Sequence, residues 1–368
     1  MKNKKLEQYE PDFGKEEADA VYEYMKTGAW LTEHIKTREF EEQVSSFLGV
    51  KNCITVNNGT ISLSLALLAL GVKPGDNVIV PTLSMIATAN AVTLIGAKPI
   101  FYDIEPETLC LDVTQSLDEF IELWQPKAII YVSLNGRRGY TNELRLFCKL
   151  NDIGFIEDAA QAFGSESKDG QKIGTLADIT SFSLSPHKII STGQGGLLTT
   201  DDDILAQKLR RLKDFGRDKG GNDIHDYFGI NSKFTDLQAV IGIEQLKKIT
   251  NRIIIKKALY NCYKELLSDV KEIEFISTDT DTITPWFCDL YTEKRDILSY
   301  YLMKDKNIRT RKMYPPIHKQ QCYKVNNSWK LPVAEKYSKK GLWLPSSFNL
   351  SFEQVNYICE SIKIFFSK

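Results

Sequence analysis

Residues 128–158 read AIIYVSLNGRRGYTNELRLFCKLNDIGFIED, and this stretch decides the fold. Its first five residues form an apolar, partly β-branched run that predicts a buried strand. A helical pattern follows at 141–150, and a second short apolar run at 154–157 predicts another strand. A strand, a helix and a strand in this order predict two parallel strands joined by a crossover helix.

The same alternation continues on both sides of this unit. Helical patterns occur at 61–70 and 87–95, and they lie between further short apolar runs that predict strands at 53–56, 77–80, 99–102, 180–183 and 196–199. Strands that alternate with helices are typical of an α/β fold, in which a mostly parallel sheet carries helices on both faces.

The pattern changes after about residue 200. Three helical segments come first, at 203–212, 235–249 and 252–267. The remainder contains two short strands and two helices, which we expect at 273–276, 285–290, 294–304 and from residue 351 onward. This order predicts a large domain at 1–245 and a smaller C-terminal α+β domain at 246–368, attached through the long helix.

The composition is that of an ordinary globular protein. The 368 residues are 42% hydrophobic and 26% charged, with 47 Lys+Arg against 48 Asp+Glu. The net charge of -1 gives no electrostatic argument for a nucleic acid or an anionic membrane as a partner. The longest apolar run, 63–70, is far too short to span a bilayer, so we expect no membrane partner.

Cysteine and histidine usage bears on the compartment and on metals. The seven cysteines are scattered and never in CxxC spacing, which argues against a disulfide framework and against a thiolate metal site. The four histidines are far apart and form no HExxH motif. No apolar segment follows the first lysines, so no secretion signal is expected. We expect a protein of the cytoplasm that holds no metal.

The first candidate site is the turn NNGT at 57–60, between the strand at 53–56 and the helix that follows. A polar, glycine-containing turn that opens a helix presents free backbone N–H groups and the positive end of the helix dipole. Such a turn binds anions, and Thr60 adds a hydroxyl. The alternative is an N-capped turn without a ligand, as in any α/β protein.

The second candidate is Asp158, in the segment FIEDAAQ at 155–161. It lies at the carboxyl end of a predicted central strand, the edge where open α/β sheets bind their ligands. A carboxylate buried there needs a cation or strong hydrogen-bond donors. The alternative is that Asp158 caps a helix.

The third candidate is Lys188, at the end of the segment SFSLSPHK at 181–188 and followed by TGQGG at 192–196. A partly desolvated lysine in such a loop has a lowered pKa and becomes an amine nucleophile that can form a Schiff base. The alternative is a surface lysine. The glycine segment does not fit the dinucleotide motif GxGxxG, because residue 198 is leucine, so a dehydrogenase has little support.

Taken together, the three candidates are more specific than any one of them. An anion-binding turn, a carboxylate and a lysine are expected at the same edge of one sheet. Pyridoxal 5'-phosphate requires a phosphate site, a carboxylate that pairs with its pyridine nitrogen and a lysine that forms a Schiff base. The sequence therefore predicts pyridoxal phosphate as the cofactor.

At this point the chain resembles the DegT/StrS family of sugar aminotransferases, and in particular its perosamine-synthase-like members. The resemblance covers nearly the whole chain. It rests on the three site segments together with GAWLT at 28–32, PTLSMIATAN at 81–90, NSKFTDLQA at 231–239, RTR at 309–311, YPPIH at 314–318 and LP at 344–345. The resemblance implies an aspartate aminotransferase-like fold and a pyridoxal phosphate enzyme.

The resemblance also implies catalytic roles for two residues. Lys188 forms the Schiff base and later moves a proton between cofactor and substrate, and Asp158 keeps the pyridine nitrogen protonated. Further cofactor contacts are expected from Gly59, Thr60 and Ser183 at the phosphate, from Gln161 near the ring hydroxyl and from Met85, where the family usually has an aromatic residue stacked on the ring. Asn231 is expected to reach the phosphate of the neighbouring subunit's cofactor, which implies a homodimer with shared active sites.

Four residues are candidates for binding the substrate: Trp30, His187, Arg311 and His318. For Trp30 the resemblance suggests a lid or packing residue near the sugar, and for His318 a loop that approaches the substrate. His187 either contacts the sugar and assists proton transfer or points away from the site, and the second interpretation is favoured. Arg137 and Arg138 depart from the family pattern and are natural clamps for a phosphate or carboxylate.

We therefore expect an aminotransferase that moves an amino group from L-glutamate to a nucleotide-linked keto-sugar, with pyridoxamine 5'-phosphate as the intermediate form of the cofactor. A 4-keto-6-deoxy sugar is favoured over a 3-keto sugar, and the expected setting is surface polysaccharide biosynthesis. A phosphorylated sugar that reaches Arg137 or Arg138 stays open as the acceptor. The alternatives are a pyridoxamine phosphate-dependent sugar dehydratase, whose family members carry histidine at the position of Lys188, and a non-catalytic relative that binds a sugar nucleotide.

Overall fold

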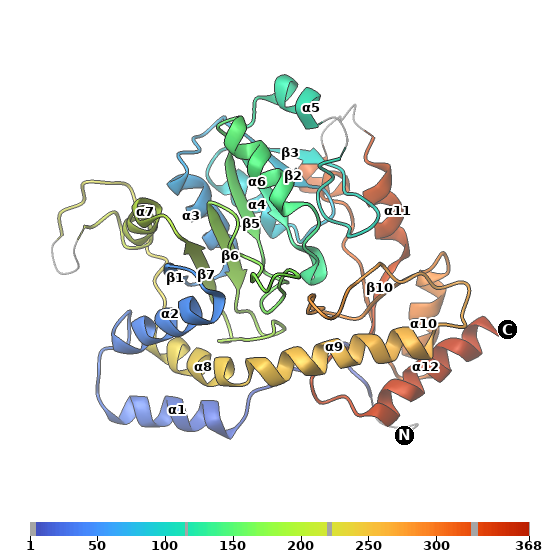
Figure 1. Ribbon diagram of the computed structural model, residues 1–368. Coiled ribbons are helices and arrows are strands. Elements are labelled where there is room, and N and C mark those ends of the chain that lie inside the picture. Colours follow the sequence, from blue (N-terminus) through green and yellow to red (C-terminus); the bar gives the residue numbers. More distant parts are fainter. Residues whose placement is uncertain (1–4, 115–116, 219–222, 325–329, 368) are drawn as a thin grey trace.

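The computed structural model describes residues 5–114, 117–218, 223–324 and 330–367 (Figure 1). A seven-stranded sheet with the strand order β1-β7-β6-β5-β4-β2-β3 forms its centre. All seven predicted strands are present: β1 (Asn52–Val56), β2 (Asn77–Pro81), β3 (Lys98–Tyr102), β4 (Ala128–Val132), β5 (Gly154–Asp158), β6 (Ile179–Ser183) and β7 (Gly196–Thr200). Only β7 runs antiparallel to its neighbours, so the expected mostly parallel α/β sheet is confirmed.

Helices cover both faces of this sheet because its strands alternate their side chains between two cores. On β4, Ala128 and Ile130 face one core, while Ile129 and Tyr131 face the other. The first core is closed by α3 (Gly59–Ala69), α4 (Ala87–Leu94) and α7 (Asp203–Lys213). The opposite face is covered by α2 (Ile35–Leu48), α5 (Leu117–Trp124), α6 (Thr141–Leu150) and α8 (Asp236–Lys247).

A second, three-stranded antiparallel sheet has the order β8-β10-β9. Its strands are short: β8 (Asp289–Tyr291), β9 (Arg311–Lys312) and β10 (Gly341–Trp343). The long helix α9 (Ile249–Leu266), α10 (Arg295–Asp305) and α12 (Phe352–Phe366) share a separate hydrophobic core with this sheet. In Figure 1, α9 runs beneath the large sheet and continues to the small one.

The remaining helices lie at the ends of the chain and in connections. They are α1 (Lys15–Lys26), α11 (Pro332–Lys340) and the short 3-10 turns η1 (Leu134–Gly136), η2 (Ile317–Lys319) and η3 (Gln321–Tyr323). The chain start does not stay with the large sheet: Leu6 bridges Ile308, and the Glu10 N–H donates to Ser347 Oγ at 2.7 Å. Within the described residues, no helix is long and apolar enough to cross a bilayer.

Two predicted strands of the C-terminal part are wrong in extent. At 273–276 the structure has a single bridge, between Glu274 and Tyr291, and at 285–290 the strand begins only at Asp289. Trp286 and Phe287 in this segment are buried by packing their rings on one another and on Trp343, not by pairing in a sheet. The apolar residues of these segments therefore predicted burial correctly, but they predicted strand pairing only in part.

Candidate active site

The carboxyl edge of the large sheet opens into a cavity of about 670 Å³. Three segments meet there: the start of α3, the end of β5 with Asp158, and the loop after β6 with Lys188. Because β7 is antiparallel, its first residue lies at this same edge, with Gly196 paired to both Val56 and Ser183. The topology thus brings together the three segments that the sequence analysis singled out.

The start of α3 forms a cup lined by backbone N–H groups and hydroxyls. Asn58 caps the helix, since its side-chain oxygen accepts the Ile61 N–H at 2.9 Å. The backbone N–H groups of the first helical turn have no partner within the helix and point outward. Gly59, Thr60 and Ser183 line the cavity around this turn. The capping and the anion-binding interpretations of this turn are therefore compatible.

Two glycines make the cup possible because backbone segments approach closely. A Cβ on Gly196 would lie 2.7 Å from the carbonyl carbon and oxygen of Asn58, closer than real side chains come. A Cβ on Gly59 would lie 3.1 Å from the Cβ of Ser183, inside ordinary contact. Glycine at both positions lets the helix start beside β6 and β7 and leaves room for an anionic group.

Asp158 ends β5 with a nearly buried carboxylate that faces the cavity. Thr88 Oγ1 donates to its Oδ2 at 2.9 Å, and the Ala160 N–H donates to its Oδ1 at 3.2 Å. Burial raises the pKa of this carboxyl, while the two hydrogen bonds and the charge of Lys188 oppose that rise. No helix follows directly, so Asp158 does not act as a helix cap, and a cation placed beside it would be favoured.

Lys188 lies in the loop after β6, and its amine faces the same cavity. Desolvation by burial lowers the pKa of this amine to about 7, with Asp158 raising it and Arg311 lowering it further. A large share of the amine is therefore unprotonated at neutral pH, which is the form that attacks a carbonyl. The surface-lysine alternative does not apply to Lys188.

Other lining residues frame the space between Asp158 and Lys188. The Gln161 side-chain oxygen accepts the Asn135 N–H at 2.8 Å, which fixes the amide at the cavity wall. Met85 also lines the cavity, and its side chain is exposed. This donor set fits pyridoxal phosphate: a cup for the phosphate, a buried carboxylate that forms no ion pair with a described residue, and a lysine with a lowered pKa.

Two of the four substrate candidates line this cavity. The guanidinium of Arg311 lies over the rings of Tyr314 and Trp343, 5.5 and 5.2 Å from their centroids. His187 lines the cavity too, so the structure does not support the favoured interpretation that it points away. Burial, together with the nearby Lys188 and Arg311 charges, lowers the pKa of His187 to about 4, and its imidazole is neutral at neutral pH.

Trp30 and His318 lie outside the cavity lining. Trp30 is 69% exposed, and its carbonyl accepts the Tyr24 hydroxyl at 2.6 Å. His318 is buried: its Nδ1 shares a 2.6 Å hydrogen bond with Thr82 Oγ1, and its Nε2 lies 3.3 Å from Glu335 Oε1. Within one described chain, neither side chain is brought to the site.

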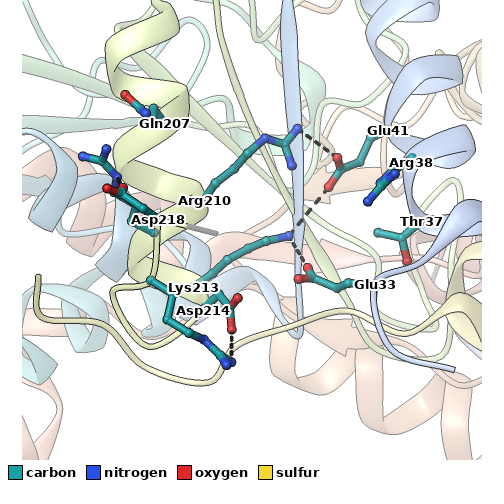
Figure 2. Close-up of a pocket in the computed structure, with 11 residues that line it drawn as sticks. Glu33, Thr37, Arg38, Glu41, Gln207, Arg210, Lys213, Asp214 and Asp218 are labelled. Carbon is teal, nitrogen blue, oxygen red and sulfur yellow. Dashed lines mark hydrogen bonds and ion pairs between the residues drawn. The ribbon is translucent and has the colours of Figure 1, made fainter. Parts of the chain in front are cut away.

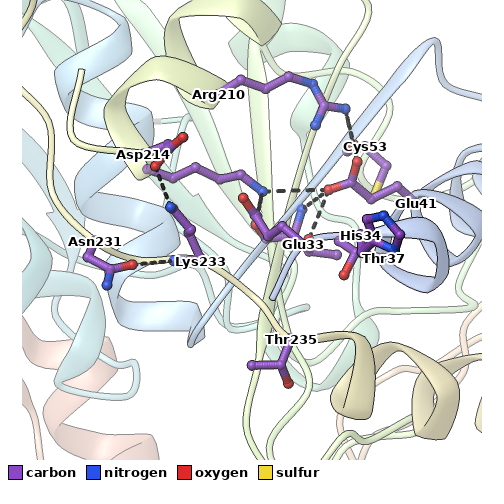
Figure 3. A network of polar contacts seen from close by, with 12 residues as sticks. Glu33, His34, Thr37, Glu41, Cys53, Arg210, Asp214, Asn231, Lys233 and Thr235 are labelled. Atoms are coloured by element: carbon purple, nitrogen blue, oxygen red, sulfur yellow. Dashed lines mark hydrogen bonds and ion pairs between the residues drawn. The ribbon is translucent and has the colours of Figure 1, made fainter. Parts of the chain in front are cut away.

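Asn231 also lies away from this cavity. Figure 3 shows it at the edge of a polar network, beside Lys233 and Asp214. Its side-chain oxygen accepts the Lys233 N–H at 3.5 Å, and Lys233 Nζ pairs with Asp214 at 2.6 Å. Asn231 itself is exposed and available to a partner.

The expectation that Arg137 clamps a substrate is wrong. This side chain is fully buried, where its Nη2 donates to both oxygens of Asp289 at 2.8 Å and its Nε donates to Thr278 at 3.1 Å. Arg137 and Asp289 form a buried ion pair between the two sheets, so the Arg137 charge does not face the cavity. Arg138 is bonded to Thr141 and Asn142 and does not line the cavity either.

A second, charged pocket of about 320 Å³ lies beside α2 and α7 (Figure 2). Its charges are largely paired with one another: Arg210 with Glu41 at 3.0 Å, and Lys213 with Glu33 and Glu41. Lys213 also donates to the Thr55 carbonyl at 2.7 Å, which ties α7 to β1. The cations and carboxylates of this pocket nearly balance, and their ion pairs hold α2 and α7 together.

Comparison with known proteins now adds to this geometry. The sequence profile of the DegT/DnrJ/EryC1/StrS aminotransferase family matches residues 11–363. The chain belongs to this family. It is 36% identical to a GDP-perosamine synthase of Escherichia coli O157:H7 over 363 residues, 98% of each protein. The expected family and enzyme class, a sugar aminotransferase, are confirmed.

Solved structures of this family have the same fold. An aminotransferase from Brucella abortus superimposes with a TM-score of 0.90 at 28% identity, over 96% of each chain. NtdA from Bacillus subtilis, which contains the bound cofactor pyridoxamine phosphate, superimposes with a TM-score of 0.89 at 28% identity over 100% of this chain and 87% of its own. The expected fold class and the pyridoxal phosphate cofactor of the family are confirmed.

Several residues around the cavity were missed by the sequence analysis. Thr88 supports Asp158, while Ser185 and Tyr314 line the cavity. All three lie inside motifs that had been singled out, at 81–90, 181–188 and 314–318. The motifs marked the right segments, but only the folded chain shows which of their side chains turn inward.

Proposed function

We propose that this chain transfers an amino group from L-glutamate to a nucleotide-linked keto-sugar, with a 4-keto-6-deoxy sugar favoured. The observation that carries the proposal is the convergence of the α3 cup, Asp158 and Lys188 on one cavity in a chain of this family. The similarity to a GDP-perosamine synthase over the whole length supports a sugar of the perosamine type and a role in surface polysaccharide biosynthesis. A spore coat polysaccharide biosynthesis protein of Bacillus subtilis, 30% identical, supports the same setting.

The cofactor and the residues of the cavity have different roles in the transfer. Pyridoxal phosphate, when bound, supplies an electron sink for the bond that is broken at the substrate carbon. Gly59, Thr60 and Ser183 would bind its phosphate, and Asp158 would pair with its protonated pyridine nitrogen. Lys188 would hold the cofactor through its amine and, when the amine of the donor displaces it, would accept and return the proton at the substrate carbon.

Arg311 and His187 are proposed to bind the substrates. Arg311 is a cation at the cavity wall, and no described carboxylate forms an ion pair with it. A guanidinium held against aromatic rings binds a carboxylate or phosphate in two-pronged geometry, which suits L-glutamate or the diphosphate of a nucleotide sugar. The neutral imidazole of His187 can exchange hydrogen bonds with a sugar hydroxyl.

We further propose a cytoplasmic homodimer with shared active sites. Support comes from a set of exposed apolar side chains on the segments that flank Asn231 and its network: Trp30, Leu31, Ile35, Tyr227 and Phe228. Large exposed apolar groups of this kind mark an interaction surface. All seven cysteines are free thiols, which fits a reducing compartment. The small sheet, which shares a core with α9, α10 and α12, supports a C-terminal domain at 246–368. Leu6 joins that core from the start of the chain, and Tyr291 and Trp343 of the small sheet pack into the core of the large one.

The amino donor is tested by the visible spectrum of the protein with pyridoxal phosphate. L-Glutamate is expected to abolish the absorption band of the lysine-bound cofactor and to produce the spectrum of pyridoxamine phosphate, with one 2-oxoglutarate released per site. D-Glutamate serves as the control, because the lysine amine acts from one face of the cavity. A band that ignores L-glutamate contradicts the donor, and the absence of any band contradicts the cofactor assignment and favours a non-catalytic binder.

The shared site is tested by replacing Asn231 with alanine. We expect a particle of twice 41.9 kDa in analytical ultracentrifugation and about tenfold weaker retention of pyridoxal phosphate in the variant, since one hydrogen bond to a charged group is lost. Asn151→Ala, on the exposed end of α6, is the matched control and should retain the cofactor like the wild type. A monomeric protein, or equal retention in both variants, would remove Asn231 from the phosphate site.

A further inference from the structure

The Lys188 amine lies over a buried indole. Trp286 is 4% exposed, and the Lys188 amine lies over its ring, 4.1 Å from the centroid. The ring is fixed by its neighbours: Phe287 stacks on it at 3.8 Å, and Trp343 meets it edge-on at 5.6 Å. An amine this close to an immobile indole face is in cation–π contact.

The same residue also holds the backbone of the lysine loop. The indole N–H of Trp286 donates to the carbonyl of His187 at 2.8 Å. On the other side of the lysine, the carbonyl of Ile189 accepts a hydrogen bond from Arg252 at 2.9 Å. Two side chains from the C-terminal half thus fix the residues that flank Lys188.

Trp286 is itself anchored by α9. Lys256, one helical turn after Arg252, is buried and donates to the Trp286 carbonyl at 2.9 Å. Its amine forms no ion pair with a described carboxylate, and it lies among the rings of Tyr9, Phe287 and Phe348. The ring, the indole N–H and the backbone carbonyl of Trp286 are therefore all held in place, and Trp286 has little freedom to move.

We propose that Trp286 is a positioning residue for Lys188: its ring holds the free lysine amine whenever the lysine is not bonded to the cofactor, and its indole N–H keeps the loop in register. This inference rests on the proposed function, because only an enzyme of that kind releases and recaptures its lysine. The released amine must stay near the substrate carbon in order to move a proton. A flexible four-carbon side chain has no such fixed position unless a contact supplies one.

The charges around the Lys188 amine come from several elements. Asp158 on β5 favours the protonated amine, and Arg311 on β9 and any charge on His187 disfavour it. Lys256, which donates to the Trp286 carbonyl, adds a second amine, and burial lowers its pKa to about 7. The indole face therefore acts with Asp158, and both oppose burial by stabilising the ammonium form.

The experiment uses cofactor-free protein and measures how fast the visible band appears after pyridoxal phosphate is added, as a function of pH. The rate should rise with pH through the Lys188 pKa, since the unprotonated amine is the reacting form. In Trp286→Leu the midpoint should shift by about 0.5 to 1.5 units to lower pH, because an apolar wall remains but the ring is lost. The rate at high pH should also fall, because the hydrogen bond from the indole N–H that fixes the loop at His187 is lost as well.

Two further variants separate the ring from the indole N–H. Trp286→Phe keeps a ring and loses the hydrogen bond to His187, so the midpoint should move less than in Trp286→Leu, while the rate at high pH still falls. Trp124→Phe, a tryptophan on α5, is the matched control and should behave like the wild type. The same midpoint and the same limiting rate in all four proteins would overturn the proposal.

A second readout needs neither cofactor nor a leucine variant that folds. The tryptophan fluorescence of the wild type, after subtraction of the Trp286→Phe spectrum, should titrate with the same midpoint, because a neighbouring ammonium changes the emission of the ring beneath it. This titration should disappear in Lys188→Ala, and its persistence there would overturn the contact. A wild type that gives this titration but no visible band would instead contradict the proposed function.

Discussion

Replacing Lys188 with alanine is expected to reduce turnover by at least about 10⁴-fold, the largest effect of any single change in this chain. The variant loses the amine that binds the cofactor and the base that moves the proton at the same position. No described side chain can replace this amine. The neighbouring His187 has a neutral imidazole, which cannot form a Schiff base, and the Lys256 amine donates to the carbonyls of Trp286 and Ser346.

The measurement is turnover with L-glutamate and a nucleotide-linked keto-sugar, together with the visible spectrum. The variant should fold and bind pyridoxal phosphate through the α3 cup, but the band of the lysine-bound cofactor should be absent. Lys188→Arg is the matched control: it keeps the positive charge and loses the nucleophile, so it should be equally inactive. Substantial turnover in either variant would show that another residue carries the chemistry.

Much of this site was predictable because its parts are local in sequence. Each of the seven strands is a short apolar run, and a parallel sheet places the end of every such run at one edge. The turn at 57–60 follows β1, Asp158 ends β5 and Lys188 lies in the loop after β6, so their meeting at that edge follows from the topology. What the alternation alone could not show is that β7 runs antiparallel, which is what brings Gly196 to the cup.

The rest of the site depends on partners that are far apart in the chain. Arg137 carries the mark of an anion clamp in sequence, but its carboxylate partner Asp289 is 152 residues away, and only the packing of the two sheets brings them together. Trp286 likewise reaches Lys188 across 98 positions of sequence through the C-terminal part. The individual roles of the site residues stay predictions that the variants described here test, and the domain division stays a prediction.

Replacing Asp158 with asparagine is the second large effect, with an expected loss of about 10² to 10⁴-fold in turnover. The amide is nearly isosteric but carries no charge, so the pyridine nitrogen of the cofactor is no longer held in its protonated form. Lys188 is intact, and the visible band of the lysine-bound cofactor should still form. The Asp158 variant therefore differs from Lys188→Ala, in which that band is lost.

The pH dependence of cofactor binding distinguishes the loss of the Asp158 charge from a disturbance of packing, because only the loss of charge shifts the pH midpoint in a predictable direction. In the wild type the Asp158 charge raises the pKa of Lys188, which burial lowers to about 7. Without that charge the amine should deprotonate at still lower pH, so the midpoint for band formation should fall below about 7 in Asp158→Asn.

Thr88→Val is the matched control for Asp158→Asn, because it removes the hydroxyl that donates to Asp158 Oδ2 and leaves the carboxylate in place. Losing this one neutral hydrogen bond, worth about 1 kcal/mol, should cost turnover only about fivefold. The Lys188 midpoint should stay close to that of the wild type as long as Asp158 is ionised. If Asp158→Asn and Thr88→Val instead lose turnover equally and leave the midpoint unchanged, Asp158 acts only in packing, and the carboxylate that serves the cofactor must be sought elsewhere.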